Sequence, residues 1–233
     1  MILIVRIPPK HLGCKNFLDG VSREVGDLTG ENMTIKESIP LPQKEDKLFK
    51  SDVDWKNNAC LNFSHDMWEG YISGYRLAGD IAVEHVKNEG RDQDFLVYPI
   101  VFLYRQYLEL RLKDIIKNGY QLFDLNESFS QNYNVGQLWK SAREIMERAW
   151  PNEATKELDA IESCVNEFCR IDPTSTSFRY PQDKKGKRAL EGLTHINLRN
   201  LAEIINKLAD FLDGAAWGIS EYLSSKYENM FSV

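Results

Sequence analysis

Residues 98–117, YPIVFLYRQYLELRLKDIIK, decide the fold that this sequence predicts. Apolar side chains recur there at helical spacing on one face, at Ile100, Leu103, Tyr107, Leu110 and Ile115. A second apolar set fills the neighbouring face, at Phe102, Leu108, Leu112 and Ile116. A helix with two apolar faces leaves only a narrow strip for water. We therefore expect residues 98–117 to form the central helix of the fold.

Three charged residues interrupt this apolar surface at steps of four: Arg105, Glu109 and Lys113. At this spacing they share one stripe of the helix, and each can pair with the next. One interpretation is a salt-bridge ladder on a solvated face, which is the usual meaning of such a pattern. The other is a polar strip that reaches out of a core helix to hold a neighbouring loop or a ligand.

Length and composition predict a water-soluble chain with a good core. The 233 residues are 42% hydrophobic, which suffices for one domain, and no apolar run approaches the roughly 20 residues that cross a bilayer. The first residues, MILIVRIPP, lack a basic leader and a cleavage site, so we expect a cytoplasmic protein without a membrane. The four cysteines lack any C-x-x-C spacing and are expected to be free thiols.

The chain is predicted to divide into an N-terminal arm, residues 1–56, and a helical body, residues 57–233. The arm is polar and rich in glycine and proline, with a short β-prone start at residues 1–5. The body holds further helices over residues 65–89, 135–150, 152–170 and 195–227. In the first of these, Gly70, Gly74, Ala78 and Ala82 fall at steps of four and predict a side that lies very close to another helix. Pro99 is expected in the first turn of the central helix, and Gly119 is expected to end it.

A long irregular segment, residues 171–194, separates the last two helices, and such loops in compact domains usually serve a function. Arg179 stands there between two aromatic residues, so we expect its guanidinium to be held by an acid such as Glu109, Glu167 or Asp172. One interpretation is a structural latch that fixes the loop to the bundle. The other is a binding pocket for a nucleotide or phosphate. The predicted binding residues are Arg105, Glu109, Lys113, Asp172, Arg179 and Tyr180.

Several chemistries are excluded because their motifs are missing. The sequence has no Gly-rich phosphate loop, no G-x-S-x-G and no H-E-x-x-H, and its four histidines are far apart, so we predict no metal site and no cofactor. His195 is expected at the start of the last helix, where the helix dipole favours a neutral ring that can take a proton. With Arg188, it could cleave RNA without metal: the imidazole activates the ribose 2′-hydroxyl and the guanidinium stabilises the phosphorane. The alternative is a solvated basic loop followed by a helix-start histidine.

The order of these segments resembles the HEPN superfamily of helical bundles. The resemblance rests on a Gly/Ala-lined helix, YPIVFLYRQYLELRLKDII, NVGQLWKSARE, a helix that ends in DPTSTSFRYP, and a long last helix, and it covers residues 55–227. It is nearest to a prokaryotic branch with a P-I-x-F-L-Y-R-x-Y-x-E-L signature. Many HEPN proteins are metal-independent ribonucleases of toxin and antiviral systems; others are inactive partners or nucleotide-handling modules. They are often dimers.

The catalytic signature of that superfamily is Arg, four to six residues, then His, commonly beginning Arg-Asn. Arg188 and His195 have six residues between them and satisfy this spacing, but Ala189 follows the arginine. Arg199-Asn200 matches the usual opening, but Ile204, Ile205 and Asn206 stand where the histidine would be. Under the second alignment the nuclease centre has been lost. Asn134-Val135 also replaces a frequent His-Asp before the third helix.

These observations together predict an all-α, HEPN-like bundle of about five main helices with an extended N-terminal arm, homo-oligomeric through its last helix. The resemblance implies an RNA-directed component of a prokaryotic defence or toxin system, with Arg188 and His195 as the catalytic pair of a ribonuclease. The first alternative is an inactive adaptor that binds a partner protein of the same system. A nucleotide-sensing module is the second alternative.

Overall fold

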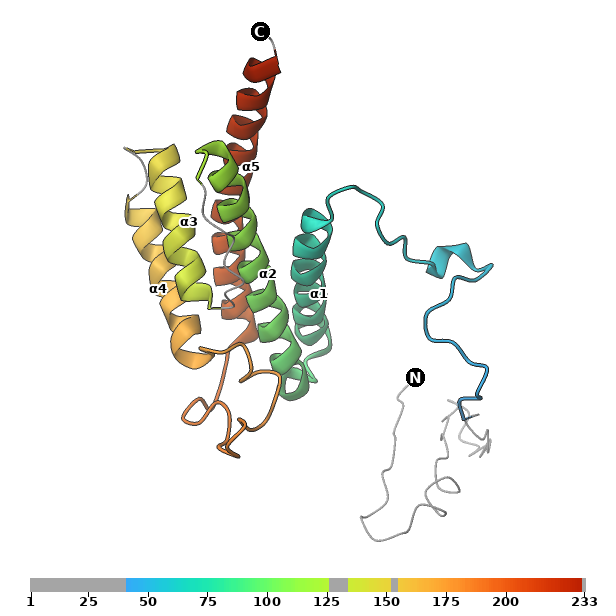
Figure 1. Cartoon of the computed structure of the whole chain (residues 1–233). Coiled ribbons are helices and arrows are strands. Elements are labelled where there is room, and N and C mark those ends of the chain that lie inside the picture. Colours follow the sequence, from blue (N-terminus) through green and yellow to red (C-terminus); the bar gives the residue numbers. More distant parts are fainter. Residues whose placement is uncertain (1–40, 126–133, 152–154, 232–233) are drawn as a thin grey trace, which may run out of the picture. The chain divides into compact units, whose positions relative to one another are not determined.

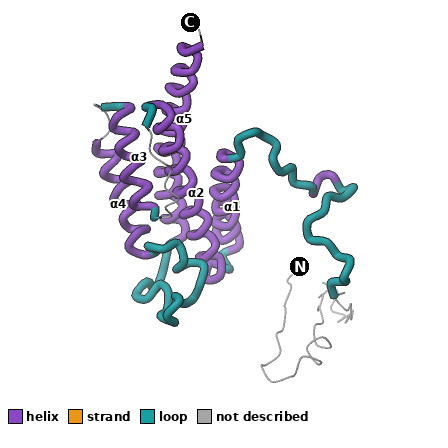
Figure 2. The backbone as a smooth tube through the Cα atoms, in the orientation of Figure 1, coloured by secondary structure: helices purple, strands orange, loops and turns teal. Residues whose placement is uncertain are grey.

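A computed structural model describes residues 41–125, 134–151 and 155–231, and this part of the chain is helical without strands (Figure 1, Figure 2). The helices are α1 (Trp68–Glu89), α2 (Gln93–Leu122), α3 (Val135–Ala149), α4 (Thr155–Ile171) and α5 (Leu198–Phe231), preceded by a 3-10 turn, η2 (Trp55–Asn57). The predicted all-α bundle is therefore confirmed.

The chain divides into two units, Met1–Cys60 and Leu61–Val233. The structure describes the first unit from residue 41 on. A turn there is closed by Asn58, whose side chain accepts a hydrogen bond from the Asp52 N–H and donates one to the Asp52 carbonyl. The strand predicted for residues 1–5 lies outside the described residues. The second unit contains all five helices of the described chain.

The centre of the bundle is α2, as its two apolar faces predict. It contacts α1, α3 and α5, and α4 packs on α3 (Figure 1). Thirteen of its residues are buried, including Tyr104, Leu108 and Leu112, which are fully inaccessible to water. Fully burying one such aliphatic side chain contributes about 1.5–3 kcal/mol. These contacts make α2 the main source of the core.

Gly119 lies inside α2 rather than at its end, which corrects the prediction. The helix continues to Leu122, and a Cβ atom at Gly119 would overlap the side chain of Ile145 on α3. The glycine is therefore explained by a close helix approach and not by a C-cap. Pro99 likewise lies beyond the first turn, because α2 already begins at Gln93. Pro99 has no N–H to donate to the carbonyl of Phe95, four residues earlier. Because Pro99 is exposed, water can hydrogen-bond that carbonyl instead.

The small-residue side of α1 is not the side that packs closely, so that expectation is wrong. A Cβ atom at Gly74 would meet nothing within 4 Å, and Ala78 is exposed. The close approach occurs at Gly79, where a Cβ atom would stand 2.8 Å from the Tyr104 ring. Gly74 and Ala78 lie on the exposed side of α1, whereas Ala82 packs partly against the core and Gly79, the residue after Ala78, faces α2.

A polar cluster fixes α1 and α5 to α2. Asp213 accepts hydrogen bonds from Arg111 Nε at 2.7 Å, from the Tyr107 hydroxyl at 2.8 Å and from Arg76 at 3.0 Å. Burial, together with the negative charge of Asp213, raises the pKa of Tyr107 well above its ordinary value. The Tyr107 hydroxyl therefore stays protonated and donates to the carboxylate. This cluster ties three helices together.

Candidate functional site

The charged stripe of α2 forms the predicted ladder, but it is buried rather than solvated. Arg105 donates to Glu109 at 2.9 Å, and Lys113 donates to the other carboxylate oxygen at 2.8 Å. The three residues are only 1%, 2% and 8% exposed. Buried charges persist where they are paired and hydrogen-bonded, and here one carboxylate serves two cations. The ladder is thus part of the core and is closed to a ligand.

Arg105 also reaches the start of the connection between α4 and α5, at residues 172–197. Its Nε lies 3.8 Å from a carboxylate oxygen of buried Asp172. The other oxygen of Asp172 accepts from the backbone N–H groups of Thr176 and Ser177, at 2.8 and 3.0 Å. One aspartate therefore turns the chain and fastens it to α2. The stripe is thus a salt-bridge ladder but not a solvated one, and the second interpretation applies in that Arg105 holds a neighbouring loop.

Arg179 is not held by an acid, contrary to the prediction. Its Nε donates to the Ser175 carbonyl at 2.6 Å, and its guanidinium lies over the rings of Phe102 and Tyr180 at 5.7 and 5.6 Å. Among the described residues it has no carboxylate partner within ion-pair distance. Asp172, one of the expected partners, is paired with Arg105 instead. The positive charge of Arg179 is therefore free to attract an anion.

Arg179 lines a hollow of about 680 Å³ together with Tyr180 and Arg188, which we call the arginine hollow. Tyr98 of α2 forms another part of its wall. A hydrogen bond from the Ala189 N–H to the Pro181 carbonyl, at 3.0 Å, joins two segments of the connection. It brings Arg188 to the same side of the connection as Arg179. Arg188 makes no ion pair within the described part of the chain. Among the described residues, the charged side chains that line this hollow are thus two arginines.

His195 lines a different, neighbouring cavity of about 280 Å³, which we call the asparagine cavity. Its walls are mainly apolar and come from α2, α4, α5 and the connection, with polar groups contributed by Glu167, His195, Asn197 and Asn200. Phe178 and Leu193 line both spaces and separate them. Arg188 and His195 therefore flank a shared wall rather than one cleft. Glu109 and Lys113 line neither.

His195 stands before the last helix and not at its first residue. The helix α5 begins at Leu198, and Asn197 accepts a hydrogen bond from the Asn200 N–H at 3.0 Å, as a capping residue does. Nδ1 of His195 lies 3.1 Å from the Thr194 hydroxyl oxygen. The helix dipole acts mainly within the first turn, and His195 lies before that turn.

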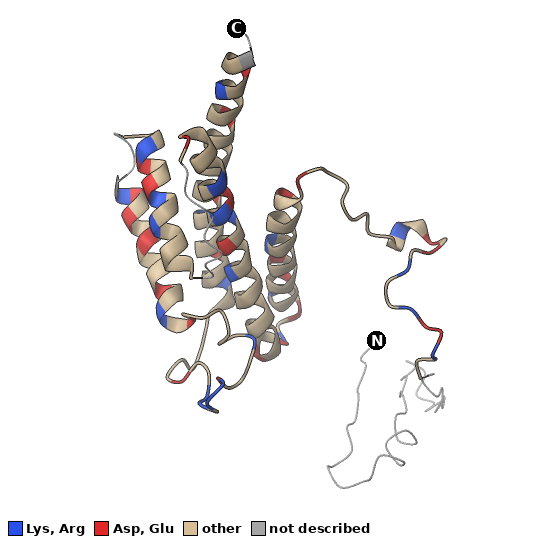
Figure 3. Ribbon diagram, in the orientation of Figure 1, with Lys and Arg blue, Asp and Glu red and all other residues tan. Residues whose placement is uncertain are grey.

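The second part of the connection, together with the first two residues of α5, carries a local excess of positive charge. Residues 179–199 contain six Lys and Arg against two Asp and Glu, whereas the whole chain contains 29 against 35. Figure 3 shows Lys and Arg positions, in blue, at the tip of this loop. Asp183 is used inside the turn, where it accepts from the N–H groups of Lys185 and Lys187, and Glu191 pairs with Lys187 at 3.1 Å. The remaining cations face water beside the arginine hollow.

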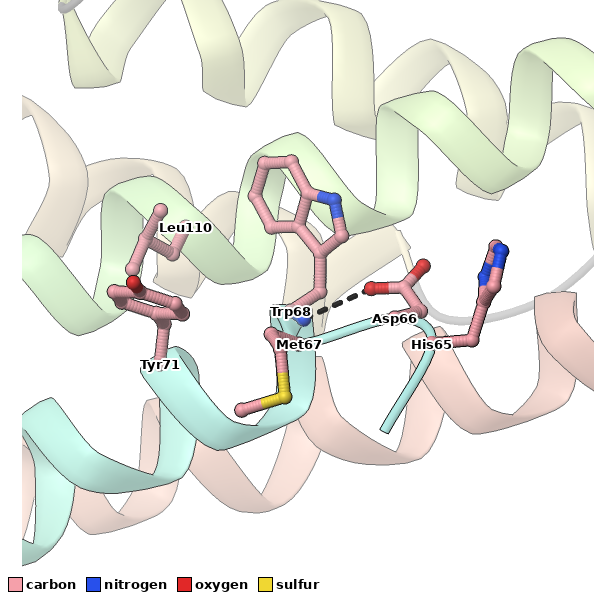
Figure 4. Close-up of a pocket in the computed structure, with 6 residues that line it drawn as sticks. All are labelled: His65, Asp66, Met67, Trp68, Tyr71 and Leu110. Carbon is pink, nitrogen blue, oxygen red and sulfur yellow. Dashed lines mark hydrogen bonds between the residues drawn. The ribbon is translucent and has the colours of Figure 1, made fainter. Parts of the chain in front are cut away.

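A further hollow lies where α1 begins, against α2 (Figure 4). It is lined by His65, Asp66, Met67, Trp68, Tyr71 and Leu110. Asp66 accepts from the Trp68 N–H at 2.9 Å and from Lys117 at 2.8 Å, so its charge is already matched. These contacts lower the pKa of Asp66, with the lysine as the main cause. The hollow offers an apolar surface with no unmatched carboxylate.

Residues outside the prediction complete the site. Tyr98 lines the arginine hollow, and Asn197 and Asn200 line the asparagine cavity. Cys164 lines the cavity too, and burial raises the pKa of its thiol, which therefore stays protonated at neutral pH. Asn197 could have been found as the helix cap, since Asn before a periodic apolar run favours that position.

The described residues contain no group of three or more His, Cys, Asp and Glu side chains placed to hold a metal ion. Within the same residues, every helix is too short or too polar to cross a membrane. No family model, no curated protein and no solved structure matches the chain.

Proposed function

We propose that this protein is an RNA-directed component of a prokaryotic defence or toxin system, and that it cleaves RNA without a metal ion. The observation that carries the proposal is the pair of adjoining spaces in the connection before α5. One holds two arginines without acid partners, and the other holds His195. The basic excess of residues 179–199 supports the same conclusion, because phosphate contacts dominate RNA affinity.

The proposed reaction is attack of a ribose 2′-oxygen on the adjacent phosphorus. His195 takes the proton of the 2′-hydroxyl as the new P–O bond forms. Arg188, which would reach the same phosphate from the other side of the wall of Phe178 and Leu193, donates to the oxygens of the phosphorane, where negative charge develops. The bond to the 5′-oxygen then breaks, that oxygen takes a proton from water, and His195 returns its proton to the solvent, which leaves a 2′,3′-cyclic phosphate. The Nε2 of His195 has no partner among the described residues and is the nitrogen that would act.

The test is cleavage of a mixed RNA pool in the presence of a chelator. We expect His195→Ala and Arg188→Ala each to lower the rate by about 10²-fold or more, since general base catalysis and charge stabilisation each contribute at that level. His65→Ala and Arg148→Ala are matched controls at the opposite end of the bundle and should cleave normally. Undiminished cleavage by a folded His195→Ala protein would reject the assignment.

An adaptor that binds a partner protein is the second candidate, and one observation favours it. Large apolar side chains are exposed on α1 and at the start of α2: Tyr71 is 61%, Ile81 62% and Phe95 78% exposed. Exposed apolar patches mark protein interaction sites. The adaptor proposal expects one stoichiometric partner that Ile81→Glu no longer binds, and no cleavage of RNA. RNA that copurifies in a salt-sensitive way would contradict it.

Self-association is proposed as part of either function. The last turns of α5 run beyond the ends of the neighbouring helices (Figure 1). Trp217 on this helix is 69% exposed, and Met230 near its end is 63% exposed. A molar mass by light scattering near twice 27.0 kDa, reduced to the monomer by Trp217→Glu, would support a dimer through α5. A monomeric mass for the unaltered protein would exclude it.

A further inference from the structure

The asparagine cavity has the composition of a small-ligand site. Its floor is rigid, because Val101, Phe178 and Ile205 are nearly or fully buried. Its mouth carries amide groups: the side-chain nitrogen of Asn197 and the whole side chain of Asn200 have no hydrogen-bond partner among the described residues. A mostly apolar pocket with a few convergent polar groups suits a flat ligand with donors and acceptors on its edge.

The charges that line the two spaces determine which part of such a ligand each space favours. Glu167 lines the asparagine cavity, and its negative charge disfavours a phosphate there. The arginine hollow is lined by Arg179 and Arg188, and these favour a phosphate. The two spaces adjoin at Phe178 and Leu193, so a ligand that passes over these two side chains can place its ring in one space and its phosphate in the other. An uncharged ring joined to a phosphate is the structure of a nucleotide.

We infer that the asparagine cavity receives one unpaired nucleobase of an RNA strand, while an adjacent phosphate lies against Arg179 and Arg188. The inference rests on the proposed function and names its substrate class. A base in a helix is stacked and paired, and it cannot enter a cavity without leaving the helix. The substrate is therefore single-stranded RNA or an unpaired loop. The amide of Asn200 hydrogen-bonds the edge of the base, and His195 lies at the mouth of the cavity.

The experiment measures binding of an end-labelled short RNA by fluorescence anisotropy, in a chelator and over a series of salt concentrations. The same sequence is tested as a single strand, as a duplex with its complement, and as a single strand with abasic riboses. The cavity variants are Asn200→Leu, which removes the amide, and Ile204→Trp, which fills the space. Asn88→Leu is the control for the asparagine change because Asn88 is exposed on α1. Unchanged melting temperatures identify folded variants.

We expect the single strand to bind about tenfold more tightly than the duplex or the abasic strand, because one buried base contributes at that level. Both cavity variants should lose about tenfold in affinity for the single strand and keep the salt dependence. Arg188→Ala should instead reduce the salt slope by about one.

Equal affinity for single strand, duplex and abasic strand would overturn the inference and leave the RNA function standing. Unchanged binding by two folded cavity variants would do the same. Failure of the unaltered protein to bind or cleave any RNA would overturn both. A free nucleoside monophosphate that binds as tightly as the strand would identify the ligand as a free nucleotide and also overturn the inference.

Discussion

Replacing Glu109 by Gln is predicted to destabilise the protein strongly, because it removes one charge from a buried set. The carboxylate accepts from Arg105 at 2.9 Å and from Lys113 at 2.8 Å, and it is 2% exposed. The amide keeps the shape but removes the negative charge that faces both Arg105 and Lys113. Breaking a buried pair by removing one partner costs about 3–5 kcal/mol. Total stabilities are about 5–15 kcal/mol, so the loss would be large.

The assay is urea unfolding followed by circular dichroism. With a slope of about 2 kcal/mol per M, the midpoint should fall by about 2 M. Glu147→Gln is the matched control: Glu147 also pairs with an arginine four residues away, Arg143 at 2.7 Å, but it is 45% exposed. Exposed pairs are worth about 0–1 kcal/mol, so its midpoint should hardly move.

A second variant separates the loss of an ion pair from the burial of unmatched charge. Glu109→Leu with Lys113→Met removes both charges and leaves Arg105 beside Asp172. Apolar replacement of buried ion pairs is often neutral, so this double variant should recover most of the stability that Glu109→Gln loses. A Glu109→Gln protein within 1 kcal/mol of the unaltered one would refute the reasoning, because the ladder would then not be closed to water.

Three further predictions concern other contacts. Asp172→Ala should expose the connection to trypsin severalfold faster in timed digests, and Asp172→Asn less so, because the amide oxygen still accepts backbone N–H groups. Gly119→Ala should lower stability by about 1–3 kcal/mol through overlap with Ile145, whereas Gly74→Ala, in open space, should raise it by about 0.5–1 kcal/mol; thermal melts compare them. Asp66→Asn should cost under about 1 kcal/mol at pH 7, since the side chain is half exposed. The lowered pKa of Asp66 means that its contribution is present above about pH 4 and is lost as the pH falls through that pKa, so unfolding curves of the two proteins should converge in acid.

Helical periodicity predicted the elements, because burial of one face follows from spacing alone. The central position of α2 is predicted in this way from its two apolar faces. Helix caps that come from distant residues cannot be predicted from spacing. Lys226 is such a cap: it donates to the carbonyls of Gln121 and Leu122, at 3.0 and 2.9 Å, at the end of α2. No local pattern relates residues that are more than 100 positions apart. The end of α2 was accordingly placed too early, at Gly119.

The sequence predicts where the candidate site lies, but it does not predict that the site consists of two separate spaces. The length, the prolines and the basic run of residues 171–194 indicated a functional connection. The separation of Arg188 from His195 depends on how Phe178 and Leu193 pack between them, and packing of loop side chains has no period in the sequence. Likewise, the spacing of Arg105 and Glu109 predicts that they pair, but only the helices around them make that pair buried.

The buried ladder and the connection depend on each other through Arg105. Stability alone does not explain why α2 keeps three charges in its core, since apolar residues of similar size are often as stable there. A charge at position 105 is needed, however, to meet Asp172, whose carboxylate turns the chain at Thr176 and Ser177. Arg179 follows that turn directly, with its Nε on the Ser175 carbonyl. The position of the arginine hollow is thus set from inside the core: Glu109 orients Arg105, Arg105 holds Asp172, and Asp172 fixes the turn that presents Arg179.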